Sequence, residues 1–96
     1  MRDYELMAIL SPALDEAGLE AAQERIRTLI TGRGGEITSV EPWGRRRMAY
    51  QIAGFREGFY TVIRFRLKPG ETEALDRQLR LTEAVIRHLM VQFEAV

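Results

Sequence analysis

The chain contains no cysteine and only one histidine, which restricts the chemistry available to it. Without cysteine it forms no disulfide, binds no zinc through thiolates and has no thiol nucleophile. The single histidine, His88, lies in an alternating stretch typical of a strand, and we expect a sheet residue rather than a catalytic base. A Ser–His pair would also need an orienting group and an oxyanion site, which no local pattern around Ser11 or Ser39 supplies. We therefore expect no enzyme activity, cofactor, metal or small-molecule substrate.

Long apolar runs are also absent. No run approaches the roughly 18 residues that cross a membrane, and Asp3 and Glu5 interrupt the stretch where a signal peptide would be apolar. A composition of 46 % apolar and 29 % charged residues excludes a disordered or collagen-like chain. Ninety-six residues suit one domain, so we expect a single domain over residues 1–96, located in the cytoplasm and without a membrane partner.

The net charge is zero, but the charge is distributed unevenly along the chain. Residues 1–24 hold six acids against one arginine (−5), residues 25–68 hold ten bases against three acids (+7), and residues 69–96 carry −2. This asymmetry indicates a basic surface and an anionic partner. All the bases but Lys68 are arginine. Codon bias in a GC-rich genome explains this preference as well as selection for the bidentate guanidinium does, and composition does not separate the two.

Apolar periodicity predicts four strands and two helices. Residues 3–10 alternate as in a strand, and Asp15 is a candidate N-cap for a helix that ends at 32–35. The apolar stripe of this helix consists of Leu19, Ala22, Ile26, Leu29 and Ile30. We then expect an extended stretch over 36–52, a turn over 53–58, a strand over 59–67, a helix from Thr72 with Ala74, Leu75, Leu79 and Leu81 as its apolar positions, and a strand over 84–93.

The order β-α-β-β-α-β predicts an α+β, ferredoxin-like fold. Right-handed crossovers place both helices on one face of a four-stranded antiparallel sheet and leave the other face open for a partner.

Several chemistries known on this fold do not suit the sequence. RNA-recognition motifs need a basic residue before the third-strand glycine and aromatics two apart, whereas this chain has Glu57 before Gly58 and places Thr61 at the second stacking position. Acylphosphatases need an asparagine and metallochaperones need paired cysteines, and both residue types are missing.

Two local patterns that could suggest a ligand site have a structural explanation. The glycines of 32–35 close a helix instead of opening one, so we expect a helix cap rather than a phosphate loop. The acids of residues 71–76 suit a helix start better than a metal site.

A basic cluster between two aromatic residues is the strongest functional signal. It is formed by Arg45, Arg46 and Arg47, flanked by Trp43 and Tyr50. In a strand, Arg45 and Arg47 project to one face and Arg46 to the other. Basic side chains interleaved with aromatic ones are a common nucleic-acid-binding pattern. The alternative interpretation of this cluster is a solvated hairpin whose positive charges are balanced by Glu36 and Glu41.

Three segments resemble the bacterial small-subunit ribosomal protein number six family. Gly44-Arg45-Arg46-Arg47-Met48-Ala49-Tyr50-Gln51-Ile52 is similar to its hallmark Gly-x-Arg-Arg-Leu-Ala-Tyr-Pro-Ile. Met1-Arg2-Asp3-Tyr4-Glu5 is similar to its start, and residues 79–89 are similar to its closing strand. The chain departs from the pattern at Gln51, where proline is usual and where a regular strand ladder could be restored, and at Arg45, where an apolar residue is common.

The resemblance implies a structural, non-enzymatic component of the small ribosomal subunit. Members bind the central region of small-subunit ribosomal RNA together with small-subunit ribosomal protein number eighteen. Carried over to this chain, the resemblance gives Arg46 and Arg47 as RNA contacts, with Arg2 and Arg87 as further basic positions near the RNA; Arg45 joins them as part of the cluster. It also implies that Met48, Tyr50 and Tyr60 lie on or near the surface facing the partner protein.

A rival hypothesis is a homodimeric enzyme or amino-acid sensor of the same fold. In that case the open face would form a pocket wall lined by Met7, Ile9, Tyr60 and Val62. A stable homodimer with a cavity between its sheets would favour this alternative, whereas the ribosomal hypothesis predicts a monomer with an exposed apolar and basic face.

Overall fold

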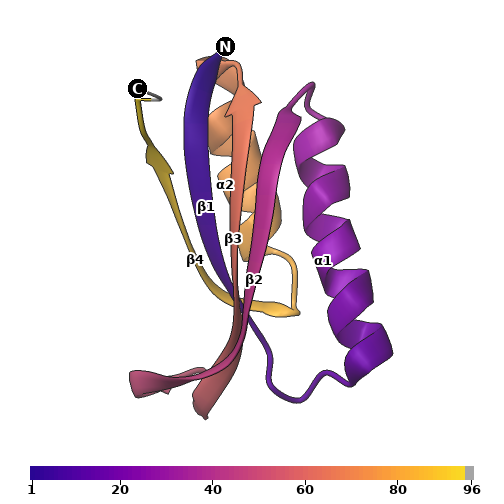
Figure 1. Cartoon of the computed structure of the whole chain (residues 1–96), viewed down its shortest axis with the longest axis vertical. Helices are drawn as coiled ribbons and strands as arrows, with labels where there is room; N and C mark the ends of the chain where they lie inside the picture. The colour runs from indigo at the N-terminus through magenta and orange to yellow at the C-terminus, as the bar shows by residue number, and fades with distance from the viewer. Residues whose placement is uncertain (95–96) are drawn as a thin grey trace.

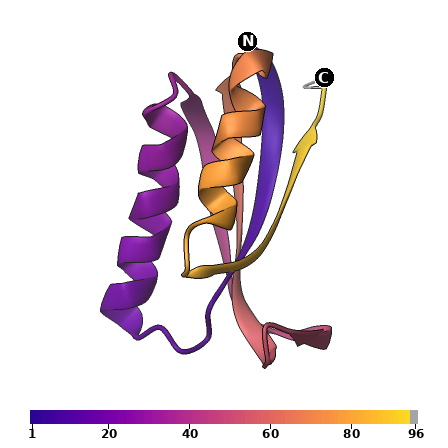
Figure 2. The ribbon, with the colours of Figure 1, turned by 180° about the vertical axis from the view of Figure 1, so that it is seen from behind.

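The computed structural model describes residues 1–94, and these form one antiparallel sheet covered by helices on one face (Figure 1). The elements follow the order β1 (Arg2–Leu10), α1 (Glu16–Thr31), β2 (Glu36–Ile52), β3 (Phe55–Leu67), the short 3-10 helix η1 (Pro69–Glu71), α2 (Thr72–Arg80) and β4 (Val85–Gln92). The strands lie in the order β2-β3-β1-β4, so β2 and β4 are the edges. Seen from behind, both helices lie on the same side of the sheet (Figure 2), which confirms the ferredoxin-like prediction. No helix in residues 1–94 has the length and apolar character needed to cross a membrane.

The core lies between the helices and the inward face of β1 and β3. The alternation expected in β1 buries Tyr4, Leu6, Ala8 and Leu10 on this face. Phe65 and Ile63 lie opposite Tyr4 and Leu6 on β3, and the rings of Tyr4 and Phe65 stack at 5.8 Å. The helices complete the core with Ala22, Ile26, Leu29, Ile30, Leu75 and Leu79. Each fully buried aliphatic side chain stabilises the fold by about 1.5–3 kcal/mol relative to an exposed one.

The helix ends follow the sequence signals with one exception. Asp15 caps α1 by accepting a hydrogen bond from the Gly18 amide at 2.7 Å, and the helix ends before Gly34, whose φ of 81° requires glycine. The expectation that Leu81 belongs to the apolar stripe of α2 is wrong. The helix ends at Arg80, and Leu81 is 78 % exposed as its C-cap residue.

The hairpin formed by β2 and β3 is longer than expected because its turn is tighter. Ile52 lies opposite Phe55, and the two residues between them, Ala53 and Gly54, have positive φ of 51° and 84°. Positive φ at both positions is the geometry of a two-residue type I′ turn. The expected turn over 53–58 is therefore wrong, and β3 begins at Phe55.

The distal part of this hairpin leaves the regular ladder. Register shifts occur between Pro42 and Gly44 and again between Arg47 and Ile52, so a regular ladder at Gln51 is not restored. The hairpin end bends away from the helices toward the β4 side of the molecule (Figure 1). This bend brings Tyr50 into contact with Arg87 near the start of β4.

Candidate nucleic-acid interface

The three cluster arginines lie in the distal half of β2 and differ in their contacts within the protein. Arg45 is engaged within the chain: its guanidinium lies 3.0 Å from the Glu57 carboxylate and 4.9 Å from the centre of the Phe59 ring, and it donates to the Pro12 carbonyl at 3.4 Å. An exposed ion pair of this kind is worth about 0.2–1 kcal/mol, so a phosphate can displace Glu57.

Arg46 and Arg47 have no carboxylate within ion-pair distance in residues 1–94. Arg46 donates from Nε to the Trp43 carbonyl at 3.3 Å, and its guanidinium lies 5.5 Å from the centre of the Trp43 ring. Arg45 and Arg47 line one shallow hollow with Pro12 and Glu57, as strand alternation predicts for the two outer arginines. Glu36 and Glu41, which were expected to balance the cluster in the solvated-hairpin alternative, form no ion pair with it in the described chain.

Arg56 is a fourth basic residue of this region, and sequence reasoning missed it. It follows the hairpin turn, lines hollows together with Arg47, and has no carboxylate partner among the described residues. We call Arg46, Arg47 and Arg56 the unpaired hairpin arginines. The only sequence signal for Arg56 is its place opposite the cluster in a hairpin, which becomes visible once the turn is located at Ala53–Gly54.

Two other arginines of the sheet are neutralised by acids on a neighbouring strand. Arg64 lies 3.0 Å from Glu5, and Arg66 lies 3.7 Å from Asp3, each across the β1–β3 pair. Such cross-strand pairs satisfy both charges within the protein. The hairpin therefore holds three arginines whose charge is left for a ligand, while Arg2 on β1 and Arg87 on β4 also lack a carboxylate partner among the described residues.

The other two predicted RNA contacts lie in separate places. Arg87, on β4, donates a hydrogen bond to the Tyr50 hydroxyl and lies 5.9 Å from the centre of the Tyr50 ring, so it borders the hairpin. Arg2 lies at the opposite end of the sheet, opposite Leu67, where it donates to Gln92 at 3.4 Å. The structure thus brings Arg87 to Tyr50, which flanks the cluster, and places Arg2 at the other end of the sheet.

An apolar groove lies between the bent hairpin and the open face of β1 and β4. It has a volume of about 250 Å³. Its walls include Met7, Ile9, Met48, Tyr50, Ile52, Tyr60 and Leu89.

Among the residues expected to face a partner, Tyr50 is 61 % exposed, whereas Met48 is only 7 % exposed and packs within the chain. Met7, Ile9 and Tyr60, named for the rival ligand pocket, all line this groove, which is open to solvent.

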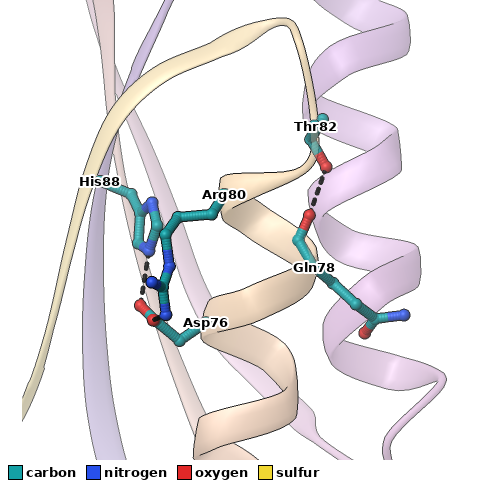
Figure 3. Close-up of polar contacts among 5 residues, drawn as sticks. All are labelled: Asp76, Gln78, Arg80, Thr82 and His88. Atoms are coloured by element: carbon teal, nitrogen blue, oxygen red, sulfur yellow. Dashed lines mark hydrogen bonds and ion pairs between the residues drawn. The ribbon is translucent and has the colours of Figure 1, made fainter.

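His88 is a sheet residue whose side chain faces α2 (Figure 3). Its Nε2 lies 2.7 Å from Asp76 Oδ1, and Arg80 donates to the other carboxylate oxygen of Asp76 at 2.5 Å. The hydrogen bond with His88 lowers the pKa of Asp76 below its ordinary value; partial burial opposes this shift, and Arg80 adds to it. Just beyond the end of α2, the Thr82 hydroxyl donates to the backbone carbonyl of Gln78 at 2.8 Å (Figure 3).

Two of the three acids of residues 71–76, which were weighed for a metal site, are used in structural pairs. Glu71 lies 3.1 Å from Arg33, and Asp76 is held by His88 and Arg80. Within residues 1–94, no group of three or more histidine, aspartate or glutamate side chains is placed to bind a metal ion.

Comparison with known proteins places this geometry in a family context. A family model described as "Ribosomal protein S6" matches residues 3–92. The small ribosomal subunit protein bS6 of Symbiobacterium thermophilum is 46 % identical over 92 residues, covering 96 % of this chain and 97 % of that protein. The bS6 protein of Carboxydothermus hydrogenoformans is 42 % identical with 96 % of each chain covered. The crystal structure of 30S ribosomal protein S6 from Thermotoga maritima superposes with a TM-score of 0.91 at 38 % identity, covering 96 % of this chain and 87 % of that one.

Proposed function

The chain belongs to the ribosomal protein S6 family of the small ribosomal subunit, and from this membership we propose that its hairpin arginines bind small-subunit ribosomal RNA in the cytoplasm. The family is a structural ribosomal family rather than a class of enzymes. Binding of the RNA takes place together with small-subunit ribosomal protein number eighteen, and the central region of the RNA is the target.

The observation that carries this proposal is the contrast between paired and unpaired arginines. Arg64 and Arg66 are neutralised by acids on the neighbouring strand, while Arg46, Arg47 and Arg56 lack a carboxylate partner within the described residues. Guanidinium groups bind phosphates through parallel N–H donors, and every phosphate that is neutralised releases counterions. The phosphates of an RNA backbone that lies along the hairpin supply the negative charges that these three arginines lack within the described protein.

Arg45, Arg87 and Arg2 act as secondary RNA contacts in this proposal. Arg45 exchanges the exposed Glu57 carboxylate for a phosphate, and Arg87 lies over Tyr50, which flanks the cluster. Arg2 contacts RNA separately, at the far end of the sheet.

The partner protein covers the apolar groove on the open face. Support comes from two exposed large apolar side chains that line it, Tyr50 and Leu89, each at 61 % exposure, and from Val91 on the same strand as Leu89, at 43 %. Exposed apolar patches mark interaction sites. Tyr50 and Tyr60 are then direct contacts, and the buried Met48 supports the hairpin wall beneath them.

Two double variants test the proposal. Arg46→Gln/Arg47→Gln removes two unpaired charges, and Arg64→Gln/Arg66→Gln removes two paired charges of the same sheet. Binding to central-region small-subunit RNA, with protein number eighteen present, is measured by filter retention. We expect the first variant to bind at least tenfold more weakly, which is about 1.4 kcal/mol, and the second to bind like wild type. Equal affinities for both variants would contradict the assignment.

A further inference from the structure

Trp43, on an outer strand of the sheet, contacts Arg46 and is not used by the preceding proposal. Trp43 lies at the register shift between Pro42 and Gly44 of β2, the edge strand, and is 40 % exposed. Gly44 has a φ of 77°, and no atom lies within 4 Å of the place where its side chain would begin. The neighbourhood of the tryptophan is therefore open at this point of the strand.

Arg46 is held against the indole ring by two contacts. Its guanidinium lies 5.5 Å from the ring centre, and its Nε donates to the Trp43 carbonyl at 3.3 Å. A guanidinium within about 6 Å of an aromatic centre is attracted to the ring face. The pair thus presents an aromatic plane with a positive charge fixed beside it.

This pair differs from the other arginine–aromatic pairs in residues 1–94. Arg45 over Phe59 is bound by Glu57, Arg64 over Phe93 is bound by Glu5, and Arg87 over Tyr50 is bound by the Tyr50 hydroxyl. Arg46 alone among these four has no side-chain hydrogen-bond partner in the described chain. Its remaining N–H donors are available for an outside ligand.

We propose that the Trp43–Arg46 pair is a stacking site for one unpaired RNA base. This inference rests on the proposed RNA binding and extends it from phosphate contact to base contact. Proteins bind the unpaired bases of RNA by stacking them on aromatic rings or on the planar guanidinium groups of arginine. Positively charged side chains nearby contact the phosphates of the same strand. The site supplies the aromatic ring and the arginine, and Arg47 supplies a further cation next to them in the chain. It differs from the stacking sites of RNA-recognition motifs, which lie on the first and third strands.

The test uses the fact that Trp43 is the only tryptophan of the protein. Full-length protein is titrated at low salt with a single-stranded oligoadenylate of about 12 nucleotides, a length within the range that single-stranded-RNA-binding folds occupy. A matched abasic oligomer of equal length and charge is the control. Affinity is followed by the anisotropy of an end label, and stacking by the tryptophan emission. We expect both oligomers to bind and only the oligoadenylate to quench the emission.

Three variants add a second readout. Trp43→Leu is expected to weaken oligoadenylate binding about tenfold and to leave abasic binding unchanged, since only the oligoadenylate has bases that stack on the aromatic ring. Trp43→Phe, which keeps a ring, is expected to stay within about threefold of wild type. Arg46→Lys, which keeps the charge and loses the plane, is expected to reduce the preference for oligoadenylate over the abasic oligomer.

The outcomes separate the two proposals. Binding of both oligomers without quenching, with Trp43→Leu equal to wild type, overturns base stacking and leaves the arginine–phosphate proposal standing. Binding of neither oligomer at low salt overturns base stacking, while the arginine–phosphate proposal is decided by the paired and unpaired double variants on central-region RNA.

Discussion

Gly58 is the position where one added methyl group is expected to disturb the hairpin most. It is buried in β3, opposite Arg46. A Cβ at this position would lie 2.3 Å from Ile9 Cγ2 and 3.3 Å from the Leu10 carbonyl oxygen. Contacts below 3.0 Å are not tolerated, and Ile9 is itself 6 % exposed and a wall of the apolar groove. Gly58→Ala therefore forces either Ile9 or the bent hairpin to move.

The cost of this movement is that of overpacking a buried site, about 1–3 kcal/mol. In a domain of this size each kcal/mol lowers the melting temperature by about 4–8 °C, so we expect a loss of roughly 5–20 °C. Urea unfolding and thermal unfolding followed by circular dichroism measure both quantities.

Gly70→Ala is the matched control for this substitution. Gly70 lies in η1, its φ is not positive, and no atom lies within 4 Å of an added Cβ. We expect this variant to unfold within about 0.5 kcal/mol of wild type, or slightly above it. If Gly58→Ala is as stable as Gly70→Ala, the close approach of β3 to Ile9 is not as described.

Three further predictions concern stability. The pKa of Asp76 is lower in the folded protein than in the unfolded chain, so its carboxylate stabilises the fold above about pH 4, and this contribution is lost as the pH falls through the folded pKa. We therefore expect the unfolding free energies of wild type and Asp76→Asn to converge as the pH falls below about 4. A difference that stays constant on acidification would contradict this role of Asp76. Thr61 is 1 % exposed, and its hydroxyl has no hydrogen-bond partner in the described structure. We therefore expect Thr61→Val to raise the free energy of unfolding, measured in urea, by about 1 kcal/mol. A lower free energy of unfolding would show that the hydroxyl is hydrogen-bonded in the folded protein. Leu6→Ala, at a fully buried position, is expected to lower the free energy of unfolding by about 2–5 kcal/mol in the same assay. Leu81→Ala, at a position that is 78 % exposed, is expected to lower it by less than about 0.5 kcal/mol. Similar losses for the two variants would refute the core assignment.

The order of elements could be predicted because each one carries a local signal. The alternation of residues 3–10, the helical stripe that begins after Asp15, and the glycines that end it are all short-range patterns, and the structure confirms them. Gly58 misled the prediction because glycine marks either a turn or a close approach of two backbones. Here it allows the close approach to Ile9, while the turn lies at Ala53 and Gly54.

The candidate interface was predicted only in part, because ion pairing is decided by tertiary contacts. The sequence locates the arginine cluster but does not indicate that Glu57 engages Arg45 while Arg46 and Arg47 stay without a carboxylate partner in the described chain. Arg56 gains its significance from the register of the hairpin. The roles of the predicted RNA and partner contacts stay predictions.

The most direct test of the central claim is the salt dependence of RNA binding. The affinity for central-region small-subunit RNA, with protein number eighteen present, is measured over a range of salt concentrations for wild type and for Arg46→Gln/Arg47→Gln/Arg56→Gln. Each phosphate contact contributes about 0.9 to the slope of log affinity against log salt, taking the duplex DNA value as a guide. If the three unpaired hairpin arginines each neutralise a phosphate, the slope of the triple variant is shallower by about 2 to 3. A triple variant with the slope and affinity of wild type would contradict the claim that these arginines hold the RNA.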